Sequence, residues 1–292
     1  MRKTSSKSEL PRAEKTRTRA AHSPRAFRSG RQTLAPVQRS ARQSVLAKKS
    51  LGQNFLKHAQ TAERIAAAAP ITNESVVLEV GPGTGKLTRA LLTRAQKVVA
   101  VEADERLLAG LRDTFAPELE SRKLELIHAD IRTFALEQLP KGYQVVANIP
   151  YYLTGELIRR LLTAQNQPSA LTLLVQKEVA ERIVRSKKES LLSLSVKAYG
   201  EPEYRFTVPR GAFSPAPKVD SAVIVVRKIS RARFKNSEEE ARFFTLIHAG
   251  FAHKRKQLAK NFHEAGLSVS GLPERIRAED VPFSEWLKRA KQ

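Results

Sequence analysis

The chain has 292 residues, 41% of them hydrophobic, which is enough for a full core and favours two domains. It contains no cysteine, so disulfides and cysteine-based zinc or iron–sulfur sites are excluded, and no apolar run approaches the roughly 18–20 residues of a membrane span. The formal net charge of +23 indicates a polyanionic partner, with a general solubility charge as the alternative.

The positive charge is spread over the whole chain. Residues 1–49 hold 14 Lys and Arg against 2 Asp and Glu, and the remaining 243 residues hold 38 against 27. Residues 1–47 are rich in Arg, Ser, Thr and Gln without apolar periodicity, so we predict a disordered basic extension. Three explanations stay open for residues 1–45: an RNA-binding arm, a start codon assigned too early, and an organellar transit peptide. The expected compartment is therefore cytoplasmic, or organellar in the last case.

From residue 48 to 230 the pattern predicts an α/β fold, because strands and helices alternate as in a parallel sheet covered on both faces. Strands are expected at 76–80, 97–102, 124–127, 144–147 and 171–176. Helices are expected at 58–69, 86–94, 104–115, 153–164 and 177–185. Two more strands, 204–208 and 219–227, are expected to pair antiparallel at the sheet edge across the Pro-rich loop 209–217. Residues 231–292 predict a small all-helical domain, with breaks at Gly250 and Gly266.

The most informative stretch is Val77 to Gly85, where an apolar run ends in three glycines spaced two apart. This predicts a buried strand, a tight turn and the start of a helix, in which Gly81 and Gly83 let the backbone approach a ligand closely. A second apolar run ends at Glu102, whose carboxylate is placed to accept hydrogen bonds from a ribose diol. The pattern therefore predicts a pocket for an adenosine-containing cofactor, with a ligand-free glycine turn as the alternative.

Spacing separates the cofactor classes. A phosphate-binding P-loop needs glycine at position 80 and Ser or Thr at 87, but the chain has Val80 and Leu87. A dinucleotide fingerprint needs a third glycine at 86, where Lys86 stands. The remaining Glu-x-Gly-x-Gly-x-Gly spacing favours S-adenosylmethionine (SAM) over NAD. No metal site is predicted, because the six histidines form no metal-binding pattern.

The segment Asn148-Ile149-Pro150-Tyr151 follows another apolar run and is expected at the carboxyl edge of the sheet. The Asn148 oxygen and the carbonyl of Ile149 or Pro150 can accept both N–H bonds of an adenine N6 amine, which frees its lone pair. Tyr151 offers a ring face for the base, and Pro150 fixes the turn. The alternative is an ordinary strand-to-helix turn. Asp130, which ends a third strand, is predicted to bind the cofactor's adenine amine or to cap the turn after it.

From about Lys48 to the C-terminus the chain resembles the KsgA-type family of ribosomal RNA adenine N6-dimethyltransferases. The motifs that carry the resemblance are Gly52-Gln53-Asn54-Phe55-Leu56, Glu79 to Gly85, Val101-Glu102, Ala129-Asp130, Asn148 to Tyr151, Phe213 to Ser221 and Phe251 to Leu258. The segment before Lys48 departs from the family. The resemblance implies a Rossmann-like class I SAM methyltransferase sheet with a small C-terminal all-helical domain that binds rRNA.

The resemblance also implies roles for individual residues and a substrate. Cofactor contacts are implied at Asn54, Leu56, Gly81, Glu102, Asp130 and Asn148. The acceptor pocket is implied at Asn148, Pro150 and Tyr151, with Phe213 as a second aromatic wall. The family dimethylates two adjacent adenosines in a hairpin near the 3′ end of small-subunit (16S) rRNA, so we expect small-subunit rRNA and the pre-ribosomal small subunit as partners, and a monomer.

Two other functions stay open at this point. Erm-type enzymes use the same motifs on large-subunit rRNA, and relatives of the fold serve as non-catalytic RNA-binding assembly or transcription factors. The basic stretches 48–49, 182–188 and 253–256 are the expected RNA footprint, although a solvated helix face is the usual explanation of such a stretch.

Overall fold

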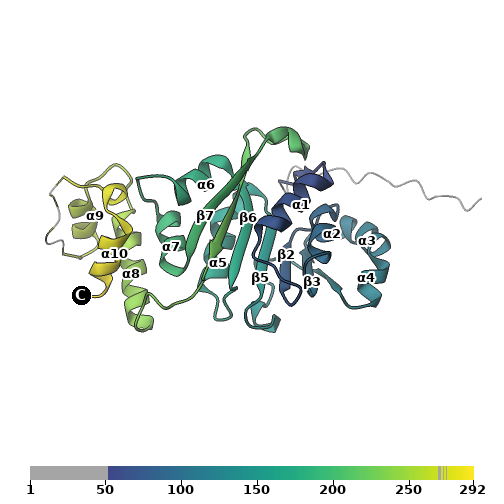
Figure 1. Ribbon diagram of the computed structural model, residues 1–292. Coiled ribbons are helices and arrows are strands. Elements are labelled where there is room, and N and C mark those ends of the chain that lie inside the picture. Colours follow the sequence, from purple (N-terminus) through teal and green to yellow (C-terminus); the bar gives the residue numbers. More distant parts are fainter. Residues whose placement is uncertain (1–51, 269–270, 272, 274) are drawn as a thin grey trace, which may run out of the picture. The chain divides into compact units, whose positions relative to one another are not determined.

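The strands of the central sheet follow the order β4-β3-β2-β5-β6-β9-β7 in the computed structural model, which describes residues 52–268, 271, 273 and 275–292 (Figure 1). The extension predicted at 1–47 lies outside these residues. The strands are β2 (Val76–Val80), β3 (Lys97–Glu102), β4 (Leu124–His128), β5 (Gln144–Asn148), β6 (Ala170–Gln176), β7 (Glu201–Val208) and β9 (Ser221–Arg227). The first five named are parallel, and β9 pairs antiparallel with both β6 and β7, which confirms the α/β prediction and the antiparallel edge.

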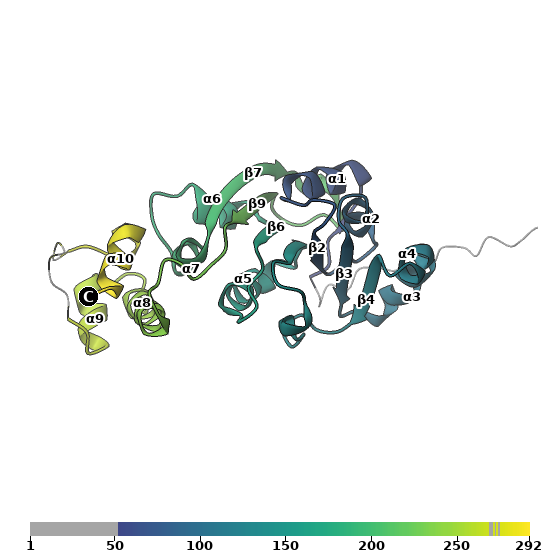
Figure 2. The same cartoon turned by 60° about the horizontal axis from the view of Figure 1, so that its bottom comes forward.

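Helices lie on both faces of the sheet (Figure 2), and a separate hydrophobic layer packs on each face. Because successive strand residues point to opposite faces, Leu78 belongs to one layer and Val77 to the other. The first layer includes α5 (Thr154–Thr163), α6 (Lys177–Val184) and α7 (Leu191–Tyr199). The second includes α1 (Ala59–Ala68), α2 (Lys86–Leu92) and α3 (Glu105–Thr114). Burial on both faces explains the mostly apolar sequences of β2, β3, β5 and β6, whereas the edge strand β4 is only partly buried.

The helix bounds fall within two residues of those predicted, and local capping explains one offset. The helix expected from residue 104 begins at Glu105, because the Asp104 side chain accepts the Arg106 amide hydrogen at 3.3 Å as the N-cap. The prediction missed two helices, α4 (Ala116–Glu120) and α7. No helix among the described residues combines the length and apolar character that a bilayer crossing requires.

The sheet reverses its strand order between β2 and β5. From β2 the chain runs outward through β3 to β4, and from β5 it runs the other way to β6. Val80 is in register with Ala147, so Gly81 and Asn148 leave the sheet side by side. The carboxyl ends of the strands at such a switch point are where open α/β sheets bind ligands.

A second, two-stranded sheet closes over this edge. In it β1 (Phe55–Leu56) pairs antiparallel with β8 (Phe213–Ser214), and Lys57 N–H donates to the Ala212 carbonyl at 2.8 Å. We call these two strands the β1/β8 clasp. It joins segments about 160 residues apart in sequence, and neither strand was predicted because each has only two residues.

Helices follow the sheet to the C-terminus: α8 (Ser237–Gly250), α9 (Leu258–Glu264) and α10 (Phe283–Ala290). They pack around Trp286, which is fully buried, and a Cβ at Gly250 would lie 2.4 Å from its ring. The predicted break at Gly250 is confirmed, because α8 ends there. Both α8 and α10 contact α7. The division into domains at 230/231 stays a prediction.

Candidate active site

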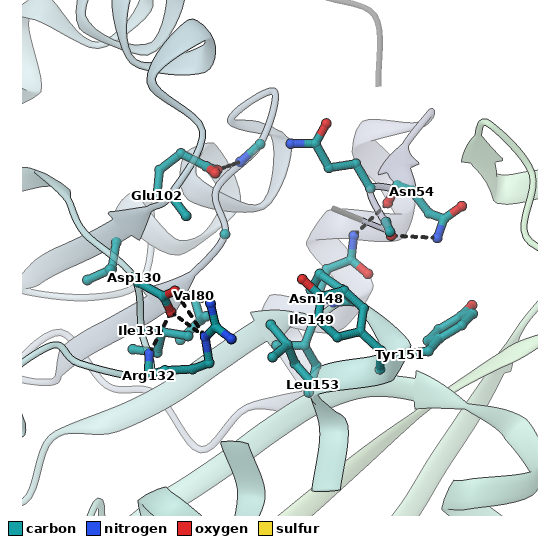
Figure 3. A pocket seen from close by; sticks show the side chains of 18 of the residues that line it. Asn54, Val80, Glu102, Asp130, Ile131, Arg132, Asn148, Ile149, Tyr151 and Leu153 are labelled. Carbon is teal, nitrogen blue, oxygen red and sulfur yellow. Dashed lines mark hydrogen bonds and ion pairs between the residues drawn. The ribbon is translucent and has the colours of Figure 1, made fainter. Parts of the chain in front are cut away.

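A cavity of about 880 Å³, measured with its open mouth, lies at the carboxyl ends of β2 to β5 (Figure 3). Its lining comes from residues 52–55, 80, 81, 83, 101–103, 129–132 and 148–153. These segments are separate in sequence and include most of the predicted site residues: Asn54, Gly81, Gly83, Glu102, Asp130, Asn148, Pro150 and Tyr151.

The glycine turn after β2 forms the floor of the cavity. Gly81 has φ +71°, its N–H donates to the Val101 carbonyl at 2.9 Å, and a Cβ built on it meets nothing within 4 Å. A ligand can therefore lie directly on this backbone. Gly83 has φ +59°, and a Cβ there would lie 2.9 Å from the Phe55 ring. Glycine is thus needed at 83 for both conformation and space.

Glu102 ties this turn to the end of β3. One carboxylate oxygen accepts the Gly83 N–H at 3.1 Å, and the other accepts the Asp104 N–H at 2.9 Å. The residue is only 6% exposed, and burial raises the pKa of its carboxyl while the two amide hydrogen bonds oppose that rise. A carboxylate offers about four acceptor positions, so two amides leave room for ligand hydroxyls.

Asp104 is a part of the site that the sequence analysis missed. It is 3% exposed, its side chain accepts from Arg106 Nε at 2.9 Å, and Gln53 Nε2 donates to it at 2.9 Å. Arg106 holds the pKa of this carboxyl well below its usual range. Asp104 therefore links the segment before β1 to the end of β3. The sequence feature that could have indicated this role is the position of Asp104, a second carboxylate two residues after Glu102.

Asp130 lines the cavity in an ion pair with Arg132, which sequence analysis also did not single out. Arg132 Nη2 lies 2.6 Å from Asp130 Oδ2, and the Arg132 amide donates to Oδ1 at 2.9 Å. Arg132 lowers the pKa of the Asp130 carboxyl. Asp130 thus caps the turn after β4, as the alternative interpretation had it, and also faces the cavity.

Asn148 ends β5 with its side-chain amide fixed in one orientation. Its Nδ2 donates to the backbone carbonyl of Asn54 at 2.9 Å (Figure 3). The nitrogen and oxygen of an amide are on opposite sides, so this bond turns Oδ1 away from Asn54 and leaves it as an acceptor. Within the described chain no other residue bonds to this amide. Asn54 reaches Asn148 because it directly precedes the β1/β8 clasp.

The turn after Asn148 is anchored at both ends. The Pro150 carbonyl accepts the Leu153 N–H at 3.0 Å, which starts the 3₁₀ helix η3 (Tyr151–Leu153). The Tyr151 hydroxyl and the Ser221 hydroxyl on β9 share a hydrogen bond of 2.7 Å. Burial raises the pKa of Tyr151, so the phenol stays protonated near neutral pH. Tyr151 is held by its hydroxyl while its ring lines the cavity.

Two predicted site residues lie outside the lining. Leu56 and Phe213 face each other in the β1/β8 clasp and are 5% and 1% exposed. Both pack in the hydrophobic layer that includes α1 and α2. Phe55 instead supplies an aromatic ring to the cavity, against Gly83. The site roles of Leu56 and Phe213 stay predictions.

The fold is that of a class I methyltransferase. It combines a parallel sheet, a glycine turn after β2, a buried carboxylate at the end of β3 and an antiparallel β9–β7 edge. Solved structures of this class match the chain. A 23S rRNA methyltransferase, ErmE, covers 82% of this chain and 100% of its own at 26% identity with a TM-score of 0.65. A dimethyladenosine transferase from Plasmodium falciparum covers 80% of this chain and 95% of its own, at 25% identity and with a TM-score of 0.66.

The family follows from sequence. The profile of the family described as "Ribosomal RNA adenine dimethylase" matches residues 45–289, so the chain belongs to this family. A ribosomal RNA small subunit methyltransferase A from Dehalococcoides mccartyi strain CBDB1 is 39% identical over 257 residues, 83% of this chain and 87% of the relative. The enzyme of that name from Fusobacterium nucleatum is 35% identical, and the match covers 84% of this chain and 96% of the relative.

Proposed function

We propose that the protein is a SAM-dependent methyltransferase that dimethylates N6 of two adjacent adenosines in a hairpin near the 3′ end of small-subunit (16S) rRNA during ribosome biogenesis. The observation that carries the proposal is the fixed amide of Asn148, whose Oδ1 is left as an acceptor in the cavity that Glu102 and Gly81 also line. Family membership supports the reaction, and the names of the relatives support the small-subunit substrate.

The residues of the cavity fit SAM. The open space above Gly81 takes a ligand against the backbone, and Glu102 is positioned to accept from the ribose hydroxyls. Asp130 is the acceptor for the cofactor's adenine amine. The Asp130 carboxylate must then accept hydrogen bonds from both the adenine amine and Arg132. When bound, SAM supplies a methyl group made electrophilic by a sulfonium.

The acceptor residues activate a weak nucleophile. The lone pair of the adenine N6 amine is delocalised into the ring, which makes the amine planar and unreactive. In the first methyl transfer Asn148 Oδ1 accepts one N–H and a backbone carbonyl of the turn accepts the other, which favours a tetrahedral amine with its lone pair free. The methylated amine loses one proton and keeps a single N–H, so one of the two acceptors serves in the second transfer. Because the Pro150 carbonyl already accepts from Leu153, it offers one remaining lone pair. Much of the rate comes from positioning, so no general base with a strongly shifted pKa is needed.

The target base is expected to stack on Tyr151. Its hydroxyl is bound to Ser221, so the ring stays in place when the base enters. A base in a duplex cannot reach this cavity without leaving its stack, so the substrate adenosine is extruded or single-stranded.

The proposal is tested by incubating the protein with tritiated SAM and either small subunits that lack these methyl groups or, in a parallel reaction, unmethylated large-subunit rRNA. We expect label in dimethyladenosine at two adjacent positions of 16S rRNA. Transfer to no RNA would refute the proposed activity. Label in large-subunit rRNA would favour the Erm-type alternative, which the structural likeness to ErmE keeps open. A Glu102→Ala variant without transfer that still restored subunit assembly in cells would favour a non-catalytic factor.

Of the three basic stretches predicted as the RNA footprint, 48–49 lies outside the described residues, 182–188 stays a prediction, and the loop before α9 is the one that we propose as an RNA contact. Residues 253–256 are all exposed, and Glu264 pairs with Lys256 at 2.6 Å and with His253 at 3.1 Å. Lys254 and Arg255 are therefore the cations of this stretch most available to phosphate. Binding in this way depends on salt through counterion release. The pre-ribosomal small subunit as partner, the monomeric state and a cytoplasmic location are parts of the same proposal.

A further inference from the structure

Tyr152 is exposed at the mouth of the cavity. The large hydrophobic side chains that stand exposed in the described part of the chain are Tyr152, at 61%, and Val219, at 45%. Tyr152 lines the cavity and Val219 does not. An isolated exposed aromatic residue needs no explanation by itself, but the Tyr152 ring also packs against the protein at the cavity.

One edge of the Tyr152 ring rests on the protein. A Cβ on Gly52 would lie 3.2 Å from Tyr152 Cε1 and 3.3 Å from Cδ1, so the ring occupies the space that a side chain at 52 would take. Pro150 Cβ lies 3.4 Å from the same point. The neighbouring Tyr151 is anchored to Ser221, so the short helix that carries Tyr152 is fixed. The ring is thus held in place and still largely open to solvent.

A positive charge lies at the same mouth. Arg132 lines the cavity, and its side chain is 54% exposed although its guanidinium is bound to Asp130. The ion pair with Asp130 holds the Arg132 guanidinium at the mouth of the cavity. A phosphate of an entering RNA strand can approach the side of the guanidinium that faces away from Asp130. An exposed aromatic ring and a cation that line the same cavity are groups with which proteins bind unpaired nucleotides.

We propose that Tyr152 is a stacking platform for the nucleobase next to the target adenosine, so that the enzyme holds two successive nucleotides, one inside the cavity and one at its mouth. The inference rests on the proposed function, because a target base inside the cavity leaves its chain neighbour at the rim. Tyr152 then contributes to RNA binding and to the choice of substrate. Tyr151, buried deeper, acts on the target base.

The test is a double-mutant cycle between protein and RNA. Small subunits are reconstituted with 16S rRNA whose 3′ segment is synthetic, either intact or with an abasic nucleotide on the 5′ or the 3′ side of one chosen target adenosine, and only methyl transfer to that adenosine is counted because one of its neighbours is the second target. The kcat/KM of methyl transfer is measured for the wild type, Tyr152→Ala and Tyr152→Phe, with Val219→Ala as the matched control for loss of exposed apolar surface. Calorimetry with S-adenosylhomocysteine, the demethylated product, checks that each variant keeps its fold and donor site.

With intact RNA we expect Tyr152→Ala to lower kcat/KM by about 5- to 100-fold, mainly through KM, while Tyr152→Phe and Val219→Ala stay within about threefold of the wild type. With the RNA that lacks the stacked neighbour, Tyr152→Ala and the wild type should become equal. Equal loss on intact and both abasic RNAs, or no loss on intact RNA, would overturn the platform. Failure of the wild type to methylate intact subunits would instead overturn the proposed function itself.

Discussion

The two halves of the cavity are built differently. In the donor half, the Glu102 carboxylate is held by amides of Gly83 and Asp104, and Asp130 is held by Arg132, so each contact lies within 19 residues in sequence. In the acceptor half, the Asn148 amide is fixed by Asn54, 94 residues away, and Tyr151 by Ser221, 70 residues away. The carboxylates of the donor half are held by contacts that are short in sequence, although Gln53 also reaches Asp104 from 51 residues away, whereas the acceptor half depends on the β1/β8 clasp and on β9.

This difference has a functional consequence. The Glu102 hydrogen bonds need only the paired ends of β2 and β3, so the donor half should keep its affinity when more distant parts are disturbed. Long-range bonds require the whole sheet to be assembled, so the acceptor half should be lost first. Catalysis and cofactor binding should therefore respond separately to mutation.

The largest expected effect separates the two halves at Asn148. Asn148→Ala removes the acceptor for the target amine, and kcat should fall by about 10³-fold, the scale of losing a positioned polar group. Because Glu102, Gly81 and Asp130 are untouched, the Kd for S-adenosylhomocysteine should stay within about threefold of the wild type. Single-turnover methylation and calorimetry measure the two quantities. Full activity in the variant would show that the proposed amine activation is wrong.

A second prediction concerns pH and only the donor half. Glu79 on β2 is fully buried below the glycine turn, and neither carboxyl oxygen has a hydrogen-bond partner within the described residues. Burial raises its pKa to about 8, and the nearby Thr88 opposes this only in part. The unfolded chain ionises near the ordinary value of 4.5 while the folded protein keeps the proton. The stability that this group contributes is thus fully present below about pH 4.5 and is lost as pH rises towards 8.

Glu79→Gln removes this dependence. Between pH 5 and 8 the wild type should lose a few kcal/mol of unfolding free energy relative to the variant, since each pKa unit corresponds to about 1.4 kcal/mol. Urea unfolding at several pH values measures the difference, and Glu74→Gln, at an exposed position before β2, serves as the matched control. Parallel pH curves for wild type and Glu79→Gln would contradict the raised pKa.

A third prediction compares two glycines with similar backbone strain. Gly83 and Gly142 have φ of +59° and +80°, so alanine at either costs about 1–2 kcal/mol. A Cβ meets the Phe55 ring at 83 but nothing within 4 Å at 142. Gly83→Ala should therefore weaken S-adenosylhomocysteine binding about tenfold, while Gly142→Ala should leave the affinity unchanged. The two variants should lose similar amounts of unfolding free energy. Equal affinities in the two variants would mean that the turn tolerates displacement of Phe55.

The same contrast explains what sequence could predict. The strands, the glycine turn, Glu102 and Asn148 follow from short-range patterns of apolar runs and turn residues, and the structure confirms the strands and their parallel order. The clasp could not be predicted, because two-residue strands have no periodicity and their pairing joins Leu56 to Phe213. The Arg132 ion pair was missed for a different reason, since an arginine two residues after an aspartate is common at a solvated turn.

The smallest expected effect tests the long-range anchor of Tyr151. Ser221→Ala and Tyr151→Phe each remove one end of the 2.7 Å hydrogen bond to β9, at a cost of about 1 kcal/mol in unfolding free energy. The ring of Tyr151 stays available to the base in both variants, so kcat should fall by less than about fivefold. Because the two residues share one bond, the double variant should be little less stable than either single variant. Additive losses would show that the hydroxyls act independently, and a large fall in kcat for Ser221→Ala alone would show that β9 positions the ring more strictly than one hydrogen bond requires.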